Sequence, residues 1–172
     1  MRPRALRPLR LAAACMLAAG LAGCAAIGLH PPRPGQTEAE VLARDGPPTA
    51  RYAMPGGATR LEYASGPAGR ETWMVDVDAA GRVTRARQVL NEAGFDAFQR
   101  HAAGMSRAEL LRTLGTPGER RSGGWQGGEV WSWRYPNNDC LWFQVSIGAD
   151  GRVRDGAYGF DPTCNRPGGA VG

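Results

Sequence analysis

The sequence carries the same pattern twice, and this repeat limits the folds that are open to the chain. Residues 35–48 match residues 104–117 at a constant offset of 69, and residues 75–83 match residues 145–153 at an offset of 70. Glycines, prolines and apolar positions stay in step, and one inserted residue accounts for the change of offset. This agreement predicts a tandem duplication.

Each copy is predicted to begin with a short amphipathic helix. Thr37 and Ser106 are suited to be N-cap residues, and Glu40 and Glu109 stand three residues later to complete a capping box. Apolar residues at helical spacing follow, and glycine and proline then end the helix. The glycines that we expect in a left-handed C-cap are Gly46 and Gly115.

The remainder of each copy alternates polar and apolar residues, which predicts strands. In the first copy Trp73, Val75 and Val77 point to one face, whereas Asp76 and Asp78 point to the solvent face, where they would serve solubility. Glycines at positive φ are expected in the hairpin turns at Gly81 and Gly151. We therefore expect an α+β fold of two tandem repeats, each a short helix followed by an antiparallel β-meander with one buried face.

The repeat also sets the domain boundaries. A single copy of about 65 residues would be marginally stable alone, so we expect the two sheets to join or to pack across one core. In the segment between the copies, Phe95 and Phe98 are expected to pack between the halves. The predicted parts are repeat 1 over 35–90, the connection over 91–103, repeat 2 over 104–164 and a disordered tail over 165–172.

The N-terminus resembles a bacterial lipoprotein signal. An arginine-rich start precedes the apolar run 11–19, which is too short to cross a membrane but suits a secretory signal. The tetrapeptide at 21–24, Leu-Ala-Gly-Cys, resembles a lipobox, so residues 1–23 would be removed. The resemblance implies that Cys24 carries acyl chains, whereas the alternative is ordinary secretion with a chance cysteine.

Lipidation would determine where the protein resides. At about 0.8 kcal/mol per buried CH₂, two or three acyl chains hold a protein on a membrane permanently. Ala25 stands where enterobacterial lipoproteins retained at the inner membrane have Asp, so the resemblance implies the periplasmic face of the outer membrane. Residues 24–34, which are rich in proline at their end, would form a lipidated tether.

The basic charge of the whole chain belongs to the signal. All 21 basic residues are Arg, against 16 acidic residues, for a formal charge of +5. Four of these arginines lie in the first ten residues, which leaves 17 against 16 in the mature chain. The near-neutral balance argues against a nucleic-acid partner.

The sequence offers little for catalysis or metal binding. Once Cys15 leaves with the signal and Cys24 is lipidated, Cys140 and Cys164 remain, and an even pair in an oxidising compartment predicts a disulfide. His30 and His101 have no second ligand nearby. No nucleophile, zinc or phosphate-loop motif is present. We therefore expect no enzyme activity, no cofactor, no metal and no small-molecule substrate.

Aromatic residues of the second copy are the candidates for partner binding. Pairing Trp133 with Phe143 across a hairpin matches the buried faces and puts Trp142 on the opposite face, across from Arg134. This pair is either a modest cation–π surface pair or an anchor for a protein partner on an open face. The alternative is that the connection or a helix covers that face. Trp125, between two Gly-Gly pairs, would lie at a loop tip, where binding residues concentrate, or fold back over the sheet edge.

The second copy resembles a known family. Its helix–turn string at 104–117, an aromatic strand, the closing Gly-Arg-Val and the lipobox together resemble the SmpA/OmlA/BamE outer-membrane lipoproteins. The resemblance covers residues 35–160 and is weaker in the first copy, which has Gln36 where Met105 stands. The tandem layout resembles the β-lactamase inhibitor protein (BLIP) architecture, in which two such units form one extended curved sheet.

The resemblance implies a non-catalytic role in the outer envelope. The expected function is a periplasm-facing protein-binding module that supports outer-membrane protein assembly or envelope integrity, with the β-barrel assembly machinery as the candidate partner. BamE is a single unit, and nothing in this duplicated chain shows that its partner-binding loop is preserved, so the resemblance does not fix the partner. The alternative is a BLIP-like inhibitor or sequestering module that acts on a periplasmic enzyme.

Overall fold

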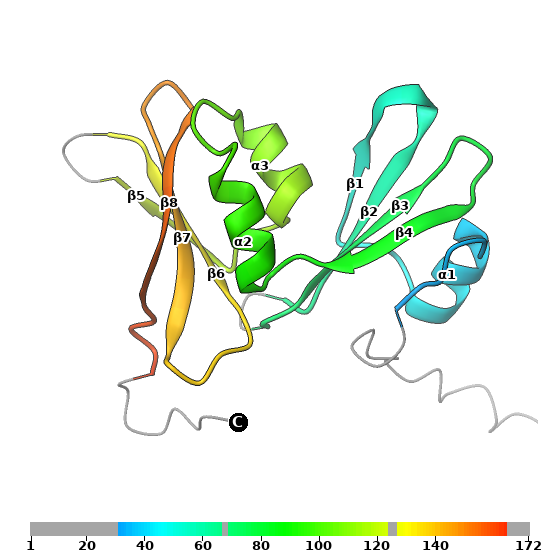
Figure 1. The fold of residues 1–172 in the computed structure, drawn as a ribbon, viewed down its shortest axis with the longest axis horizontal. Coiled ribbons are helices and arrows are strands. Elements are labelled where there is room, and N and C mark those ends of the chain that lie inside the picture. The colour runs from blue at the N-terminus through cyan, green and yellow to red at the C-terminus, as the bar shows by residue number, and fades with distance from the viewer. Residues whose placement is uncertain (1–30, 67–68, 124–126, 165–172) are drawn as a thin grey trace, which may run out of the picture.

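The computed structural model describes residues 31–66, 69–123 and 127–164. Within them the chain is an α+β protein with three α-helices and two four-stranded antiparallel sheets (Figure 1). The sheet orders are β1-β2-β3-β4 and β5-β6-β7-β8. In chain order the elements are α1 (Glu38–Asp45), β1 (Ala50–Ala53), a 3₁₀ turn η2 (Pro55–Gly57), β2 (Thr59–Ala64), β3 (Thr72–Val77), β4 (Val83–Gln88), α2 (Glu92–Gln99), α3 (Arg107–Leu114), β5 (Glu119–Ser122), β6 (Glu129–Arg134), β7 (Leu141–Ile147) and β8 (Val153–Phe160).

Capping boxes start α1 and α3, as the sequence predicts. The hydroxyl of Thr37 accepts from the N–H of Glu40 at 3.2 Å, and the Glu40 carboxylate accepts from the N–H of Thr37 at 2.7 Å. Ser106 and Glu109 repeat both bonds at 3.3 and 2.8 Å. The backbone hydrogen bond from Thr37 lowers the pKa of Glu40, so this cap holds the ionised form.

The helix ends differ from the expected left-handed cap. Gly46 has φ 77° and ψ −167°, and Gly115 has φ 82° and ψ −169°. The positive φ was expected, but ψ lies far from the left-handed helical value, in a region that essentially only glycine adopts. Each glycine N–H still bonds to the last turn, at the carbonyls of Leu42 and Leu111. The extended ψ then sends the chain directly into the following proline-containing segment and strand.

Each of these helices is tied to a hairpin of the sheet that follows it. The N–H of Glu38 donates to the carbonyl of Gly81 at 2.8 Å, beside an isolated bridge between Thr37 and Arg82. An equivalent bridge joins Ser106 to Arg152. The turn glycines Gly81 and Gly151 both have φ 75°, as predicted.

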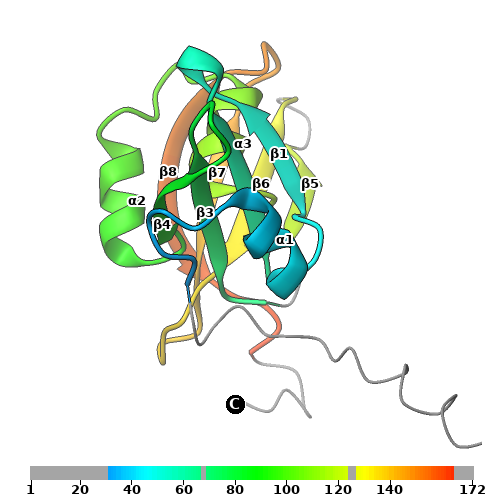
Figure 2. The same ribbon diagram turned by 90° about the vertical axis from the view of Figure 1, so that its right-hand side faces the viewer.

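The elements stack in four layers. In Figures 1 and 2, α1 lies on the outer side of the first sheet, and α2 and α3 lie between the two sheets. Under α1, Val41 is buried against a small cluster on the first sheet, which contains Leu61, Tyr63, Val75, Val77 and Val83. The residues of the first sheet that pack under α1 are therefore the apolar ones that the predicted strand alternation places on one face.

The expectation of one buried face per meander is wrong for the first sheet. On the face away from α1, Glu62 and Met74 are both 0% exposed and Thr72 is buried too. Because α3 and α2 cover this face, it becomes interior although its residues alternate with those of the α1 face. Asp76 shares this face and pairs with Arg60 at 2.5 Å. Asp76 is thus half of an ion pair, and its predicted role in solubility is wrong. Asp78 instead stabilises the hairpin turn, because its carboxylate accepts hydrogen bonds from the N–H groups of Ala80 and Arg82.

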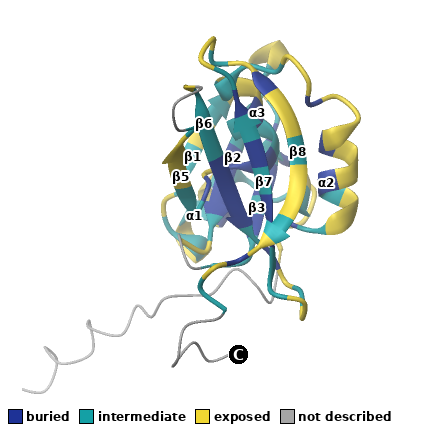
Figure 3. Cartoon of the chain, turned by 90° about the vertical axis from the view of Figure 1, so that its left-hand side faces the viewer, coloured by how far each residue is buried: buried dark blue, intermediate teal, exposed yellow. Residues whose placement is uncertain are grey.

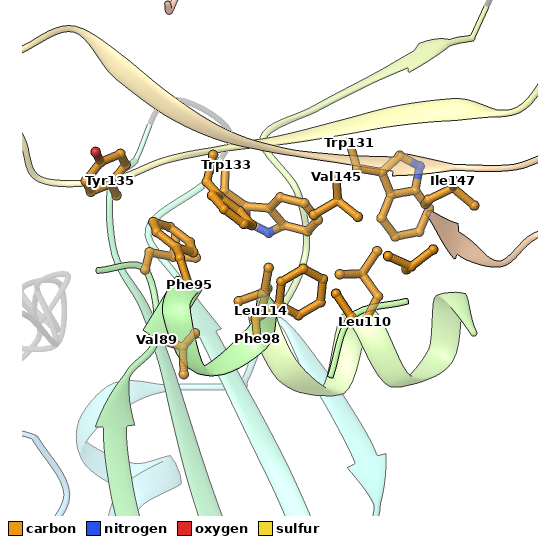
Figure 4. Packing of buried hydrophobic residues seen from close by; sticks show 14 of the residues in the cluster. Val89, Phe95, Phe98, Leu110, Leu114, Trp131, Trp133, Tyr135, Val145 and Ile147 are labelled. Carbon is orange, nitrogen blue, oxygen red and sulfur yellow. The ribbon is translucent and has the colours of Figure 1, made fainter. Parts of the chain in front are cut away.

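The main core lies between the second sheet and the helices α2 and α3. Figure 4 shows Phe95 and Phe98 of α2 and Leu110 and Leu114 of α3 pointing toward the second sheet. The ring of Phe95 stacks on Phe143 with centroids 4.2 Å apart. The two rings of the connection thus pack between the halves, as predicted. No strand of one sheet pairs with a strand of the other, so the single extended sheet implied by the BLIP resemblance is not formed.

Candidate functional site

The predicted pairing of the aromatic hairpin is present. Trp133 lies opposite Phe143, and Arg134 lies opposite Trp142. The second pair therefore faces away from α3, on the far face of the second sheet. This is the face turned toward the viewer in Figure 3.

Trp142 is buried on that face, which overturns its role as an exposed anchor. Its side chain is 2% exposed. The guanidinium carbons of Arg121 and Arg134 lie 5.3 and 5.5 Å from its ring centroid, so arginine side chains cover the ring. The indole also lies over Gly159, where an added Cβ would sit 3.2 Å from Nε1. Of the interpretations left open by the sequence, the cation–π pair of Arg134 with Trp142 is the one observed, and Arg121 joins it over the ring.

Arg134 is held by a carboxylate from the end of the second sheet. Its Nε and one Nη donate to Asp161 at 2.5 and 3.1 Å. Burial alone would raise the pKa of Asp161, but Arg134 and the N–H and hydroxyl of Thr163 outweigh it and leave the pKa below its ordinary value. Arg134 is therefore held over Trp142, with 16% of its side chain exposed.

The two cysteines predicted to form a disulfide lie next to each other as free thiols. Their hydrogen bond is the main cause that raises the pKa of Cys164. Cys140 has φ 53° in the turn between β6 and β7, and its carbonyl accepts from the N–H of Asp161 at 2.8 Å. The thiols are thus placed so that oxidation would join this turn to the residues after β8.

Two other predicted site residues lie outside the described residues. These are the lipidation site Cys24 and the loop-tip candidate Trp125. The signal 1–23, most of the tether and the tail 165–172 lie outside them as well. No helix among the described residues is long and apolar enough to cross a membrane.

The exposed aromatic residues lie on β8, where the sequence analysis did not place a site. Phe160 is 81% exposed and Tyr158 is 39% exposed, and they are the large hydrophobic residues exposed in the described part of the chain. Tyr158 leans on buried rings, with its centroid 5.4 Å from that of Phe143. The signal in the sequence was an aromatic residue at every second position, Tyr158 and Phe160, at the end of the last strand.

The outer edge of β8 pairs with no strand among the described residues, although α2 lies beside it. β8 is an edge strand, and the carbonyl of Gly156 accepts from the Gln99 side chain of α2 at 2.7 Å, so it points away from β7. Because backbone groups alternate direction along a strand, those of Tyr158 and Phe160 also point outward. The N–H of Asp161, which bonds back to Cys140, fits the same alternation.

The described residues offer little for catalysis. They contain no group of three or more His, Cys, Asp or Glu side chains that could hold a metal ion. His101 is exposed after α2. A hollow of about 760 Å³ beside β4 is lined by prolines 31, 32 and 34, Arg33, Gln36, Arg44, Thr84, Arg85 and Ala86. It contains arginine but no carboxylate, and its one hydroxyl, that of Thr84, donates to the carbonyl of Asp76 at 3.1 Å.

Comparison with known proteins gives no family. No family model matches the chain, and no curated protein matches it. A solved structure of a DUF4309 family protein, YjgB, from Bacillus subtilis is 12% identical, with a TM-score of 0.26 over 72% of this chain and 76% of that one. An extracellular SCP-domain protein from Bacillus anthracis is 13% identical, with a TM-score of 0.28 over 77% of this chain and 45% of that one.

Proposed function

We propose that this protein is a non-catalytic lipoprotein at the periplasmic face of the outer membrane that binds an envelope protein through β8. Two tandem helix-plus-meander units, related to the SmpA/OmlA/BamE unit, form its body, and Cys24 anchors it. Its role is to support outer-membrane protein assembly or envelope integrity. The observation that carries the proposal is the open edge of β8 with two exposed aromatic residues.

Two of the four edge strands, β4 and β8, contrast in a way that favours binding at β8. Soluble proteins protect sheet edges with charges, and β4 carries Arg85 and Arg87 at alternate positions. At the C-terminal end of β8 the alternate positions are Tyr158 and Phe160. An extended segment of a partner could add to this edge through backbone hydrogen bonds, while the two rings contact its side chains. Burying one aromatic side chain contributes about 1.5–3 kcal/mol, enough to dominate a small interface.

Cross-linking and co-purification from membranes test the binding edge. Phe160→Ala should lose the partner, and Phe160→Pro should lose it as well, because proline removes an outward N–H without breaking the ladder to β7. Ala157→Ser, exposed on the same strand, is the matched control and should keep the partner. Retention of the partner by both Phe160 variants, with folding unchanged, would rule out this edge.

The anchor and the envelope role need their own measurements. Cys24→Ser should release the protein from the outer-membrane fraction, and mass spectrometry of the mature N-terminus should find acyl chains on Cys24. Deletion of the gene should raise the permeability of the outer membrane to large antibiotics. If the captured partner is instead a periplasmic enzyme whose activity falls on binding, the role is inhibitory.

A further inference from the structure

The chain that enters the fold pairs with the outer edge of β4 for a short distance only. The N–H of Gly35 donates to the carbonyl of Val83, and the N–H of Val83 donates to the carbonyl of Gln36, both at 2.8 Å. Residues 31, 32 and 34, which precede this contact, are prolines. Because proline has no N–H and cannot continue a strand pairing, the entering chain leaves the edge open beyond Val83.

The open part of the edge presents the backbone of Ala86. The N–H of Val89 donates to the carbonyl of Thr72 on β3, and backbone groups alternate along a strand, so those of Ala86 point away from β3. In the second sheet the equivalent carbonyl, that of Gly156, accepts from the side chain of Gln99. Ala86 has no such partner among the described residues, so one N–H and one carbonyl are available there.

A hollow of about 760 Å³ lies beside this part of β4. It is lined by residues 31–34 and 36 of the entering chain, by Arg44 of α1 and by residues 84–86, and no carboxylate of the described chain lines it. Arg44 holds Asp45 through two hydrogen bonds of 2.8 and 2.6 Å. The guanidiniums of Arg33 and Arg85 are exposed and form no ion pair with the described residues. The hollow therefore offers cationic donors without an acid to pair with them.

Another guanidinium without an acidic partner follows along β4. Arg87 lies on the same face of the strand as Arg85, and its Nε is buried without a hydrogen-bond partner. Burial lowers the pKa of Arg87, and the guanidiniums of Arg60 and Arg85 lower it further. Asp76, the carboxylate that opposes this effect, is held by Arg60 at 2.5 Å. The edge of β4 thus carries uncompensated positive charge at alternate positions.

Packing within the unit does not require these arginines. In the second unit, the residues that match Arg33, Arg44, Arg85 and Arg87 are Ala102, Thr113, Asp155 and Ala157. The same helix, hairpin and strand therefore form without arginine at any of the four positions. Burying a charged donor without a partner is unfavourable, and an anionic ligand would supply the missing acceptors.

We propose that this edge of β4 binds an extended protein segment that carries carboxylates at alternate positions. The backbone of the segment pairs with Ala86 and adds a strand to the first sheet. Its carboxylates lie next to Arg85 and Arg87, whose spacing of two residues matches the period of a strand. Arg33 contributes a third guanidinium from the entering chain. The charges that keep a neutral strand away from β4 favour an acidic one.

The open backbone favours a protein segment over a membrane surface. Phosphate headgroups would pair with the arginines, but they would leave the N–H and the carbonyl of Ala86 without partners. A strand satisfies both kinds of group at once. The site lies on the first sheet and goes beyond the proposed binding of an envelope protein at β8, so either can fail without the other.

Fluorescence anisotropy with labelled peptides tests the site on the mature chain with Cys24→Ser. The probe has the sequence Thr-Val-Glu-Val-Glu-Val-Thr, and its control has Gln in place of both Glu residues. The acidic peptide should bind, the control should bind about tenfold more weakly, and the difference should shrink in about 0.5 M salt. Methylation of the central Val nitrogen, which faces Ala86 in the proposed pairing, should also weaken binding.

Substitutions in the protein identify the groups that the peptide contacts. Arg33→Gln and Arg85→Gln should each weaken the acidic peptide about three- to fivefold, and the double variant about tenfold. Arg100→Gln makes the same change of charge at an exposed residue after α2, so it is the matched control and should bind like the wild type. Circular dichroism and thermal unfolding establish that each variant is folded.

The proposal is overturned if the wild type does not bind the acidic peptide or binds both peptides alike. Wild-type affinity in Arg85→Gln, or undiminished binding of the N-methylated peptide, overturns it as well. If the wild type binds phosphatidylglycerol vesicles through Arg33 and Arg85 but not the peptide, the site belongs to a membrane surface and the proposal is wrong. Phe160→Ala should bind the acidic peptide like the wild type, which separates this site from the β8 edge.

Discussion

The carboxylate of Glu62 accepts a hydrogen bond from the backbone N–H of Thr116, across 54 residues of sequence. Glu62 is fully buried and also accepts from the hydroxyl of Tyr52. Burial and this bond raise the pKa of Tyr52, so the phenol remains a donor throughout the physiological range. One buried carboxylate therefore joins the first sheet to the end of α3.

Thr116→Pro should destabilise the protein by about 1–3 kcal/mol, because it leaves part of a buried carboxylate without a donor. Proline fits the backbone here, since Gly46 and Gly115 have nearly the same φ and ψ and Pro47 follows the first of them. Thr116→Ala keeps the N–H and is the control. Urea unfolding measures both, and equal stability of the two variants would show that the bond contributes nothing.

Gly156→Ala should cost about 1–3 kcal/mol through overpacking. A Cβ on Gly156 would lie 2.7 Å from Cζ of Phe143 and 3.1 Å from Cε1 of Phe98. The double variant Gly156→Ala with Phe143→Leu lacks the obstructing Cζ. Its loss of unfolding free energy should therefore be smaller than the sum of the losses of the two single variants. Thermal and urea unfolding of the two single variants and the double variant give the coupling energy, and strict additivity would contradict the close contact.

The register of the aromatic hairpin could be predicted from the sequence because strand alternation has a period of two. A shift by one residue would have turned Trp133 and Phe143 to the opposite face, so the pattern of apolar residues allowed one pairing register. The capping boxes were predictable for a similar local reason. Both features depend on residues within a few positions, or within one hairpin, of each other.

Features that depend on packing between units could not be predicted. Glu62 and Thr72 are polar and alternate with apolar neighbours, so nothing local indicates that α3 will bury them. The burial of Trp142 depends on Arg121 and on Gly159, which belong to other strands. The edge at Phe160 became a candidate site only when the strand order placed β8 at the end of the sheet.

Oxidation should join Cys140 to Cys164 in the protein isolated from an oxidising compartment. The bond would close a loop of about 25 residues and stabilise the fold by roughly 3 kcal/mol on the chain-entropy estimate. Mass spectrometry with and without reductant, and the thermal midpoint of each form, measure it. In the reduced protein, alkylation of Cys164 should be slow because its pKa is raised by the hydrogen bond with Cys140, and Cys140→Ala should speed it.

Acid should weaken the closure of Arg134 over Trp142. The pKa of Asp161 is lowered in the folded protein, so its ionised form contributes stability above the ordinary carboxyl value, near pH 4. That contribution is lost as pH falls through the lower, folded pKa. Asp161→Asn removes the titrating group, so the variant should be less stable than the wild type at neutral pH, and the difference should shrink below about pH 4.

Urea unfolding of the wild type and Asp161→Asn across this pH range measures the effect, and tryptophan fluorescence reports whether Trp142 becomes accessible to a quencher. Glu119→Gln is a suitable control, because Glu119 lies on the same sheet face and pairs with the exposed Arg121 at 3.2 Å. An exposed pair contributes little, so its loss should change stability much less. A stability difference for Asp161→Asn that does not vary with pH would show that the Asp161 side chain acts through its hydrogen bonds to Thr163 and not through its charge.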